Sequence, residues 1–132
     1  MVRLFLTLSV LLLAQPAFAA TRSCDPAQFG ARADGKTKDT KAIQAAIDDC
    51  AAKGGGTVTF TKGTYVSAPI ILKSNVTLDV AAGATLLGSP DHADYPQTTV
   101  FQAPGRQALI TAVNAHDISI TGKGTIDGNG AK

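Results

Sequence analysis

The sequence lacks an excess of charge of either sign. Its 12 Lys and Arg residues are nearly balanced by 10 acidic residues, and the formal net charge is +2. Proteins that bind nucleic acid normally carry a basic patch or stripe. The densest group of lysines, Lys36, Lys38 and Lys41, is broken by Asp34 and Asp39. We therefore expect no nucleic-acid partner, and we expect these lysines to lie in a solvated loop.

No apolar run is long enough to span a bilayer, which takes about 20 residues. The main run, Leu4 to Leu13, follows Arg3 and leads to the small residues Ala17 and Ala19. This order is typical of a secretory signal peptide cleaved after an A-x-A site. The sequence predicts that residues 1–19 are removed and that residues 20–132 form one small secreted domain, extracellular or periplasmic, without membrane attachment. An uncleaved anchor is the alternative.

Cysteine is scarce, with only Cys24 and Cys50 present. No Cys-x-x-Cys occurs, and His92 and His116 lie far apart, so nothing predicts a metal site. Export to an oxidising compartment favours a disulfide between Cys24 and Cys50. A catalytic cysteine would need a neighbouring base, which the sequence alone does not show.

Helical periodicity occurs in one segment only. The apolar residues that recur at helical spacing are Ile43, Ala46, Ile47 and Cys50. Asp39 can act as the N-cap, and the three glycines of 54–56 end the pattern. These signals predict one helix over residues 39–53, with Cys50 on its buried stripe. The absence of further helices excludes a doubly wound sheet, whose parallel strands need crossover helices.

From residue 57 onward the pattern consists of short β-rich stretches separated by Gly, Pro, Asn or Asp. We expect strands over residues 57–60, 65–67, 70–72, 76–80, 85–87, 109–113, 118–121 and 125–127. The segments beginning at Asn75 and Ala84 recur, in the same order, at Asp117 and Gly124. We interpret the offset between the two copies as two coils of a solenoid with roughly 20 to 25 residues per coil. An antiparallel β-sandwich is the alternative.

The motifs that carry a resemblance to a known family are Phe29-Gly30-Ala31, Ala33-Asp34-Gly35, Gly54-Gly55-Gly56-Thr57-Val58, Gly63-Thr64-Tyr65, Asn75-Val76-Thr77-Leu78, Asp94-Tyr95-Pro96 and Gly124-Thr125-Ile126-Asp127-Gly128. In this order they resemble the polygalacturonase family, glycoside hydrolase family 28, over essentially all of residues 20–132. The resemblance implies an all-β fold, a right-handed parallel β-helix whose first coil is capped by the helix at residues 39–53.

The same resemblance implies hydrolysis of α-1,4-galacturonosyl bonds in an acidic plant polysaccharide, either pectin or a related rhamnogalacturonan. It implies no cofactor and a monomeric full-length protein. Two functions of other kinds stay open. One is a non-catalytic polysaccharide-binding β-helix of the adhesin or tailspike kind; the other is a calcium-dependent pectate lyase, which would need clustered carboxylates.

The family's catalytic motifs are Asn-Thr-Asp, Asp-Asp, Gly-His-Gly and Arg-Ile-Lys, which supply the two carboxyl groups of an inverting hydrolase. Only an Asp-Asp pair occurs here, Asp48-Asp49. It falls in the predicted helix, where neighbouring side chains diverge by about 100° and cannot face each other across a substrate. The resemblance places the catalytic motifs beyond Lys132. We therefore expect only the first coils of the enzyme here, with no catalytic residue and no activity of their own.

The remaining candidates for chemistry are few. His116 and Asp117 are adjacent in a predicted strand, so we expect them on opposite faces and not as a dyad. We expect Asp127 to be a turn residue. The glycines within residues 122–128 miss the spacing of a dinucleotide loop.

One long loop lies between Ser89 and Gln107 and contains Asp91, His92 and Asp94. Loops are where solenoid enzymes place binding groups, so this loop is a candidate substrate subsite.

Overall fold

The computed structural model of the protein describes residues 22–100 and 102–130. The predicted signal peptide and its cleavage site lie outside these residues. In the described part of the chain, no helix is long and apolar enough to cross a membrane.

The secondary structure is one long helix and many short strands. In chain order the elements are β1 (Ser23–Cys24), the 3-10 helix η1 (Pro26–Phe29), β2 (Asp34–Lys38), α1 (Thr40–Ala52), β3 (Gly56–Phe60), β4 (Gly63–Ser67), β5 (Ile70–Leu72), β6 (Val76–Val80), β7 (Ala84–Gly88), the 3-10 helix η2 (His92–Asp94), β8 (Gln97–Val100), β9 (Ala103–Arg106), β10 (Ile110–Ala112), β11 (Ser119–Thr121) and β12 (Thr125–Asp127).

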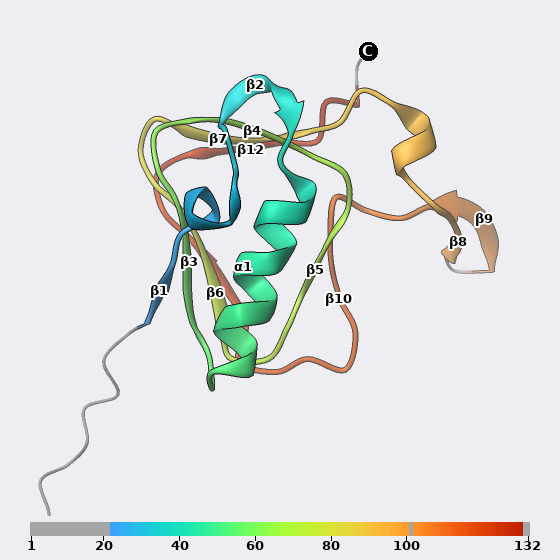
Figure 1. The fold of residues 1–132 in the computed structure, drawn as a ribbon. Helices are drawn as coiled ribbons and strands as arrows, with labels where there is room; N and C mark the ends of the chain where they lie inside the picture. The colour runs from blue at the N-terminus through green and yellow to red at the C-terminus, as the bar shows by residue number, and fades with distance from the viewer. Residues whose placement is uncertain (1–21, 101, 131–132) are drawn as a thin grey trace, which may run out of the picture.

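Three sheets form the sides of a stack of coils, seen from one end in Figure 1. The first sheet has the strand order β1-β3-β6-β11, the second β2-β4-β7-β12, and the third contains β5 and β10. All pairs in these sheets are parallel. The chain visits the sheets in turn, so the predicted right-handed parallel β-helix is confirmed.

The length of a coil differs from the prediction. Thr57 pairs with Thr77 across β3 and β6, so one coil runs from residue 57 to residue 77. Thr77 then pairs with Ser119 across β6 and β11, so the next coil is about twice as long. The two copies of the repeat are therefore neighbours in the stack, and interpreting their offset as two coils was wrong. The reason is that residues between β7 and β10 leave the stack and lengthen this one coil.

This excursion is more ordered than the loop predicted between Ser89 and Gln107. It contains η2 and an antiparallel hairpin, in which Gln97 of β8 pairs with Arg106 of β9. The hairpin projects away from the coil stack (Figure 1). The prediction of an irregular loop is corrected accordingly.

The core fills the space enclosed by the three sheets. In β6 the side chains of Val76, Leu78 and Val80 are buried, and the residues between them are half-exposed. This alternation is expected because successive side chains of a strand point to opposite faces. Phe60 and Tyr65 pack edge to face beside them, with ring centroids 5.1 Å apart.

Helix α1 covers one end of the core, as Figure 1 shows. It begins and ends within one residue of the predicted bounds, and its buried residues are Ala42, Ile43, Ala46, Ile47 and Cys50. The chain leaves the helix through Gly54 and Gly55, both with positive φ. A Cβ on Gly55 would lie 2.5 Å from the carbonyl oxygen of Asn75, so the close approach of these two turns requires glycine.

Asp39 precedes α1, but its side chain does not cap the helix as predicted. Its two carboxylate oxygens instead accept hydrogen bonds from the backbone N–H groups of Arg32 and Ala33, both at 2.9 Å. Asp39 is buried, and these bonds satisfy its charge. The residue therefore joins the turn before β2 to the start of the helix.

The coils begin earlier than the predicted residue 57, because β1 and β2 precede the helix. Lys36 and Lys38 lie in β2 and Lys41 lies in α1, so assigning all three to a solvated loop was wrong. No strand pattern is visible in this part of the sequence, because β1 has two residues and β2 consists of polar residues and a glycine.

The last described coil contains β11 and β12. Ile120 pairs with Leu78, and Ile126 pairs with Leu86, so both continue the inward-facing columns of the core. Leu78 and Leu86 are fully buried, whereas Ile120 is 50% and Ile126 is 42% exposed. These two isoleucines therefore occupy core positions of the stack but are about half exposed to solvent.

Candidate functional site

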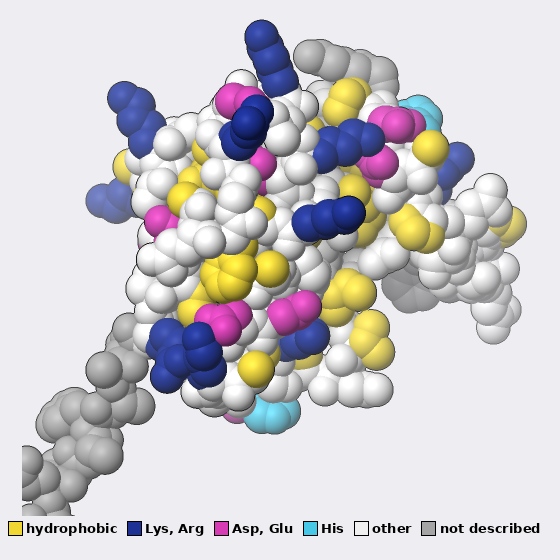
Figure 2. All heavy atoms as spheres, in the orientation of Figure 1, with side chains coloured by type: hydrophobic (Ala, Val, Ile, Leu, Met, Phe, Trp, Pro, Cys, Tyr) yellow, Lys and Arg dark blue, Asp and Glu magenta, His cyan; other side chains and the backbone are white. Residues whose placement is uncertain are grey.

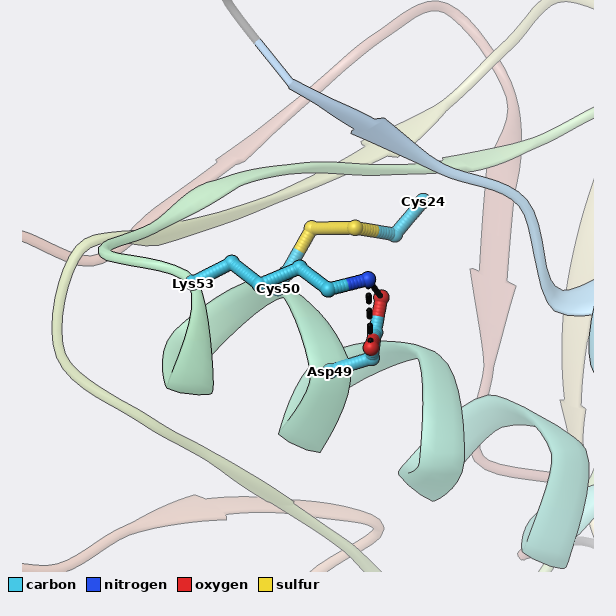
Figure 3. Close-up of a disulfide and its surroundings, with 4 residues drawn as sticks. All are labelled: Cys24, Asp49, Cys50 and Lys53. Carbon is cyan, nitrogen blue, oxygen red and sulfur yellow. Dashed lines mark hydrogen bonds and ion pairs between the residues drawn. A yellow bond between two sulfur atoms is a disulfide. The ribbon is translucent and has the colours of Figure 1, made fainter.

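Cys24 of β1 and Cys50 of α1 form a disulfide, which confirms the predicted pairing (Figure 3). Their Cα atoms are 6.1 Å apart, and both residues are buried. The bond fastens the first strand of the first sheet to the helix that closes the end of the core. Its role is structural, because neither cysteine of the described residues keeps a free thiol.

Asp48 and Asp49 each pair with a different lysine. Asp48 lies 2.8 Å from Nζ of Lys73, and Asp49 lies 2.8 Å from Nζ of Lys53, as Figure 3 shows for the second pair. Partial burial opposes ionisation of Asp48, but the ion pair with Lys73 and a hydrogen bond from Gln44 outweigh it and lower its pKa. Asp48 thus links the helix to the segment after β5, whereas Asp49 pairs with the C-cap residue of its own helix. A catalytic role is not required to explain either carboxylate.

His116 and Asp117 do contact each other, contrary to the prediction. His116 Nδ1 lies 2.8 Å from Asp117 Oδ2. Neither residue is in a strand, since β11 begins at Ser119, and Asp117 has a φ of 53°. The left-handed backbone rotates the carboxylate toward the imidazole, so the opposite-face rule for strands does not apply. Their side chains are 70% and 79% exposed, and a pair this exposed contributes little to stability.

A group of polar residues anchors the base of the excursion to the coil stack. Lys38, at the end of β2, lies 2.6 Å from Asp94 and 3.5 Å from Asp91. The Ser89 hydroxyl donates a second hydrogen bond to the Asp94 carboxylate. The hydrogen bond from Lys38, supported by that from Ser89, lowers the pKa of Asp94, and the same contact with Asp94 raises the pKa of Lys38.

Tyr95 completes this anchor. Its hydroxyl donates to the carbonyl oxygen of Ser89 at 3.1 Å, and burial raises its pKa. Gly88 lies directly beneath, where an added Cβ would be 2.9 Å from the tyrosine hydroxyl. Arg106 of the hairpin donates to the carbonyl oxygens of His92 and Tyr95 at 2.9 and 3.0 Å. The Asp94-Tyr95-Pro96 motif is therefore the point at which the excursion is fixed.

The predicted subsite acids Asp91 and Asp94 are thus brought together, and both contact Lys38 of the coil stack. Lys38 was not predicted as part of this group because it lies far before Asp94 in the sequence. Only the pairing of β2 with β4 and of β4 with β7 brings the two positions together. A subsite role for His92, Asp91 and Asp94 stays a prediction.

Asp127 is the last residue of β12, and its side chain makes the predicted bond to nearby backbone at the turn that follows. Its carboxylate accepts the backbone N–H of Asn129 at 2.8 Å. Asn129 in turn donates its side-chain amide to the carbonyl oxygen of Gly88 at 3.1 Å, which connects the last two coils. Among residues 22–100 and 102–130, no group of three or more His, Cys, Asp or Glu side chains is arranged to hold a metal ion.

A capped parallel β-helix with this motif order defines a class of proteins related to pectate lyases. Residues 27–112 match the family model described as rhamnogalacturonase A/epimerase, pectate lyase-like. The chain belongs to this family.

Two relatives illustrate the match. The exo-poly-alpha-D-galacturonosidase of Dickeya chrysanthemi is 39% identical over 117 residues, covering 80% of this chain and 19% of the relative. The solved structure of a family 28 exopolygalacturonase from Yersinia enterocolitica is 41% identical with a TM-score of 0.75, covering 83% of this chain and 21% of that chain. These relatives confirm the predicted resemblance to family 28.

A third relative is named for binding proteins and not for cleaving a polysaccharide. The plasmin and fibronectin-binding protein A of Streptococcus pneumoniae is 40% identical over 109 residues, covering 78% of this chain and 15% of the relative. The chain spans about a fifth or less of the length of the curated relatives described here.

Proposed function

We propose that this chain supplies the capped first coils of a secreted hydrolase that cleaves α-1,4-galacturonosyl bonds in pectin. The observation that carries the proposal is the similarity to the Dickeya exo-poly-alpha-D-galacturonosidase and the Yersinia exopolygalacturonase over four fifths of the chain. The matched region includes the helix and the first coils of the stack, which position all later coils of such a solenoid.

Hydrolysis with inversion requires one carboxylic acid that protonates the leaving oxygen and one carboxylate that activates the attacking water. The two carboxyl groups lie roughly 6.5 to 9.5 Å apart. The aspartates of the helix are held by Lys73 and Lys53, and those of the excursion by Lys38. We propose that the catalytic pair is supplied from outside this chain's residues, and that the 132-residue chain alone releases no reducing ends from polygalacturonate.

The proposal is tested on the native protein. Antibodies raised against residues 22–130 can retrieve it from the culture medium and the cell extract of its host. We expect retrieval from the medium, and we expect the retrieved protein to release reducing ends from polygalacturonate or rhamnogalacturonan. Retrieval from the cell extract alone would contradict secretion.

A second candidate is favoured by one observation, the 40% identity to the plasmin and fibronectin-binding protein A. Under this alternative the β-helix is an adhesin without turnover. Retrieved protein that binds plasmin and fibronectin but cleaves no uronan would favour the adhesin and contradict the hydrolase.

A further inference from the structure

Two exposed lysines lie on the same edge of the coil stack, where the first sheet turns into the second. Lys62 lies in the turn between β3 and β4, and Lys123 lies in the turn between β11 and β12. Figure 2 shows Lys and Arg side chains projecting from the corner at which these turns lie, at the left of the view. We call Lys62 and Lys123 the cationic ridge.

The pairing of the strands aligns the two lysines. Lys62 precedes Gly63, which pairs with Ala84. Lys123 lies between Gly122 and Gly124. These two glycines pack against Val80 and Ala84 of the intervening coil. The lysines thus flank one turn, residues 81–83, from the coils on either side. Two coil spacings of about 4.8 Å separate them, or roughly 10 Å.

The intervening turn carries no long side chain, because residues 81–83 are Ala-Ala-Gly. The stem of Lys62 lies over Gly83, where an added Cβ would be 3.4 Å from its Cγ. Arg32 extends the same edge by one coil, since the next residue, Ala33, lies against Gly63. Asp34 is the acidic group near Arg32, and its carboxylate is held by local hydrogen bonds.

The ridge lysines differ from three other lysines of the protein. Lys38, Lys53 and Lys73 each form an ion pair with an aspartate. Within residues 22–100 and 102–130, no carboxylate lies within ion-pair distance of Lys62 or Lys123. The charge of the ridge is therefore open to an external anion.

A column of hydroxyl groups lies beside the ridge on the second sheet. Thr64 pairs with Thr85, and Thr85 pairs with Thr125, one residue in each of three successive coils. Thr85 is half-exposed, and the next residue, Leu86, is buried, so the threonine faces outward. Each ridge lysine lies just before a threonine of this column, Lys62 before Thr64 and Lys123 before Thr125.

We propose that the cationic ridge and this threonine column bind a polyuronate chain that runs along the coil stack. The lysines would contact carboxylates, and the threonine hydroxyls would contact sugar hydroxyls. A polyuronate presents both groups repeatedly along a rigid chain, whereas a nucleic acid presents phosphates without the same hydroxyl pattern. This inference rests on the proposed function for its choice of polymer, and it adds a contact surface formed by residues of this chain.

The experiment compares variants of the 132-residue chain by retardation in native gels that contain polygalacturonate, at low and high salt. The test variant is Lys62→Gln with Lys123→Gln. The matched control is Lys41→Gln with Lys53→Gln, which removes the same charge from α1 and its C-cap residue. Fully methyl-esterified pectin serves as the neutral polymer of the same sugar, and duplex DNA as another polyanion. Circular dichroism and light scattering check that the variants share one fold and one state of association.

We expect polygalacturonate to retard the chain and methyl-esterified pectin not to retard it. The ridge variant should bind about fivefold or more weakly, because exposed charge contacts are individually weak but add along a polymer. The control should stay within about twofold of the parent. Thr85→Val should weaken retardation by polygalacturonate and leave binding to DNA unchanged.

Three results would each contradict binding of polyuronate by the ridge. They are equal losses of affinity in the ridge and control variants, equal affinity of the parent chain for DNA and polygalacturonate, and no retardation of the parent chain. None of these results bears on whether the native protein cleaves polygalacturonate. Conversely, a native protein that binds plasmin and cleaves no uronan would overturn the proposed function and leave the gel result standing.

Discussion

The side-chain amide of Gln44 pairs with both backbone groups of Ile71. Its Nε2 donates to the Ile71 carbonyl oxygen at 3.0 Å, and its Oε1 accepts the Ile71 N–H at 2.9 Å. On its other side, β5 pairs with β10, so the helix residue takes the place of a neighbouring strand. An unpaired strand edge is a template for association, and Gln44 closes this one.

Replacing Gln44 by Leu removes two hydrogen bonds to Ile71 and one to Asp48 while helix propensity is kept. It should lower the free energy of unfolding by about 0.5 to 1.5 kcal/mol for each hydrogen bond lost. Urea unfolding measures the loss. Hydrogen exchange of the Ile71 amide should accelerate more than that of its neighbours. Lys41→Leu is the control on the same helix, because Lys41 is exposed and makes no such contact. Equal effects of the two substitutions would contradict the edge-closing role.

The buried stripe of α1 should dominate the stability of the capped end. Ile47 is fully buried, so Ile47→Ala should cost about 2 to 5 kcal/mol through the cavity it leaves. Thermal or urea unfolding measures this loss. Replacing Ala52, which is exposed on the same helix, by Ser is the control and should change little. A loss below about 0.5 kcal/mol for Ile47→Ala would show that the helix is not part of the cooperative core.

The disulfide should be complete in the purified, unreduced protein. Thiol titration of the denatured, unreduced chain should detect no free thiol, and two free thiols would contradict the pairing of Cys24 with Cys50. The double variant Cys24→Ala with Cys50→Ala should unfold with about 3 to 4 kcal/mol less free energy, because the unfolded chain regains the freedom that the cross-link removes. Urea unfolding of the oxidised and double-variant chains measures the difference.

The pKa of Asp34 should lie well below the ordinary value of an aspartate. Its carboxylate accepts backbone N–H bonds from Thr37 and Lys36, at 2.7 and 2.9 Å, and the Thr37 hydroxyl adds a third bond. These bonds lower the pKa of Asp34 to about 2. NMR titration of its side-chain carbon measures this value. Thr37→Val should raise the pKa only in part, because the backbone bonds remain.

The same shift has a consequence for stability. Because the folded-state pKa of Asp34 is depressed, the ionised group stabilises the fold above its unfolded pKa of about 4. This contribution is lost as the pH falls from about 4 to about 2. The parent chain should therefore lose more stability across this range than Asp34→Asn, whose amide does not titrate. Parallel pH profiles for the two proteins would contradict the assignment.

The exposed isoleucines of the last coil should make the 132-residue chain self-associate. Ile120 and Ile126 continue buried columns yet are about half exposed, beside the free edges of β11 and β12. Light scattering should show concentration-dependent oligomers, reduced by Ile120→Ser with Ile126→Ser. Ile71→Ser is the matched control, since Ile71 is 44% exposed on another face. A monomer at all concentrations would contradict this prediction.

Most of the fold was predictable because the local signals were strong. The helix has apolar spacing and glycines at its end, and β5, β6 and β12 begin and end at the predicted residues. Residues 34–38 carry no such signal because every position there is polar or glycine, and the strand forms only through pairing with β4. This strand could not be predicted, because it depends on pairing with residues distant in the sequence and not on a local pattern.

The candidate site was harder to predict, for two physical reasons. The contact between His116 and Asp117 depends on a positive φ at Asp117, which a period-two pattern does not encode. The ion pair between Lys38 and Asp94 depends on how many residues each coil takes. The offset between the two repeat copies fits either one long coil or two short ones, and only the strand pairing distinguishes them.

The excursion between β7 and β10 doubles the length of one coil while the strands on either side keep their register. Closing a flexible loop costs entropy that grows only with the logarithm of its length, so this doubling adds about 0.6 kcal/mol. The hydrogen bonds of Asp94, Tyr95 and Arg106 are individually of comparable worth. A lineage can therefore lengthen, shorten or exchange this segment at little thermodynamic penalty, and the coil stack remains a fixed frame on which surface recognition varies.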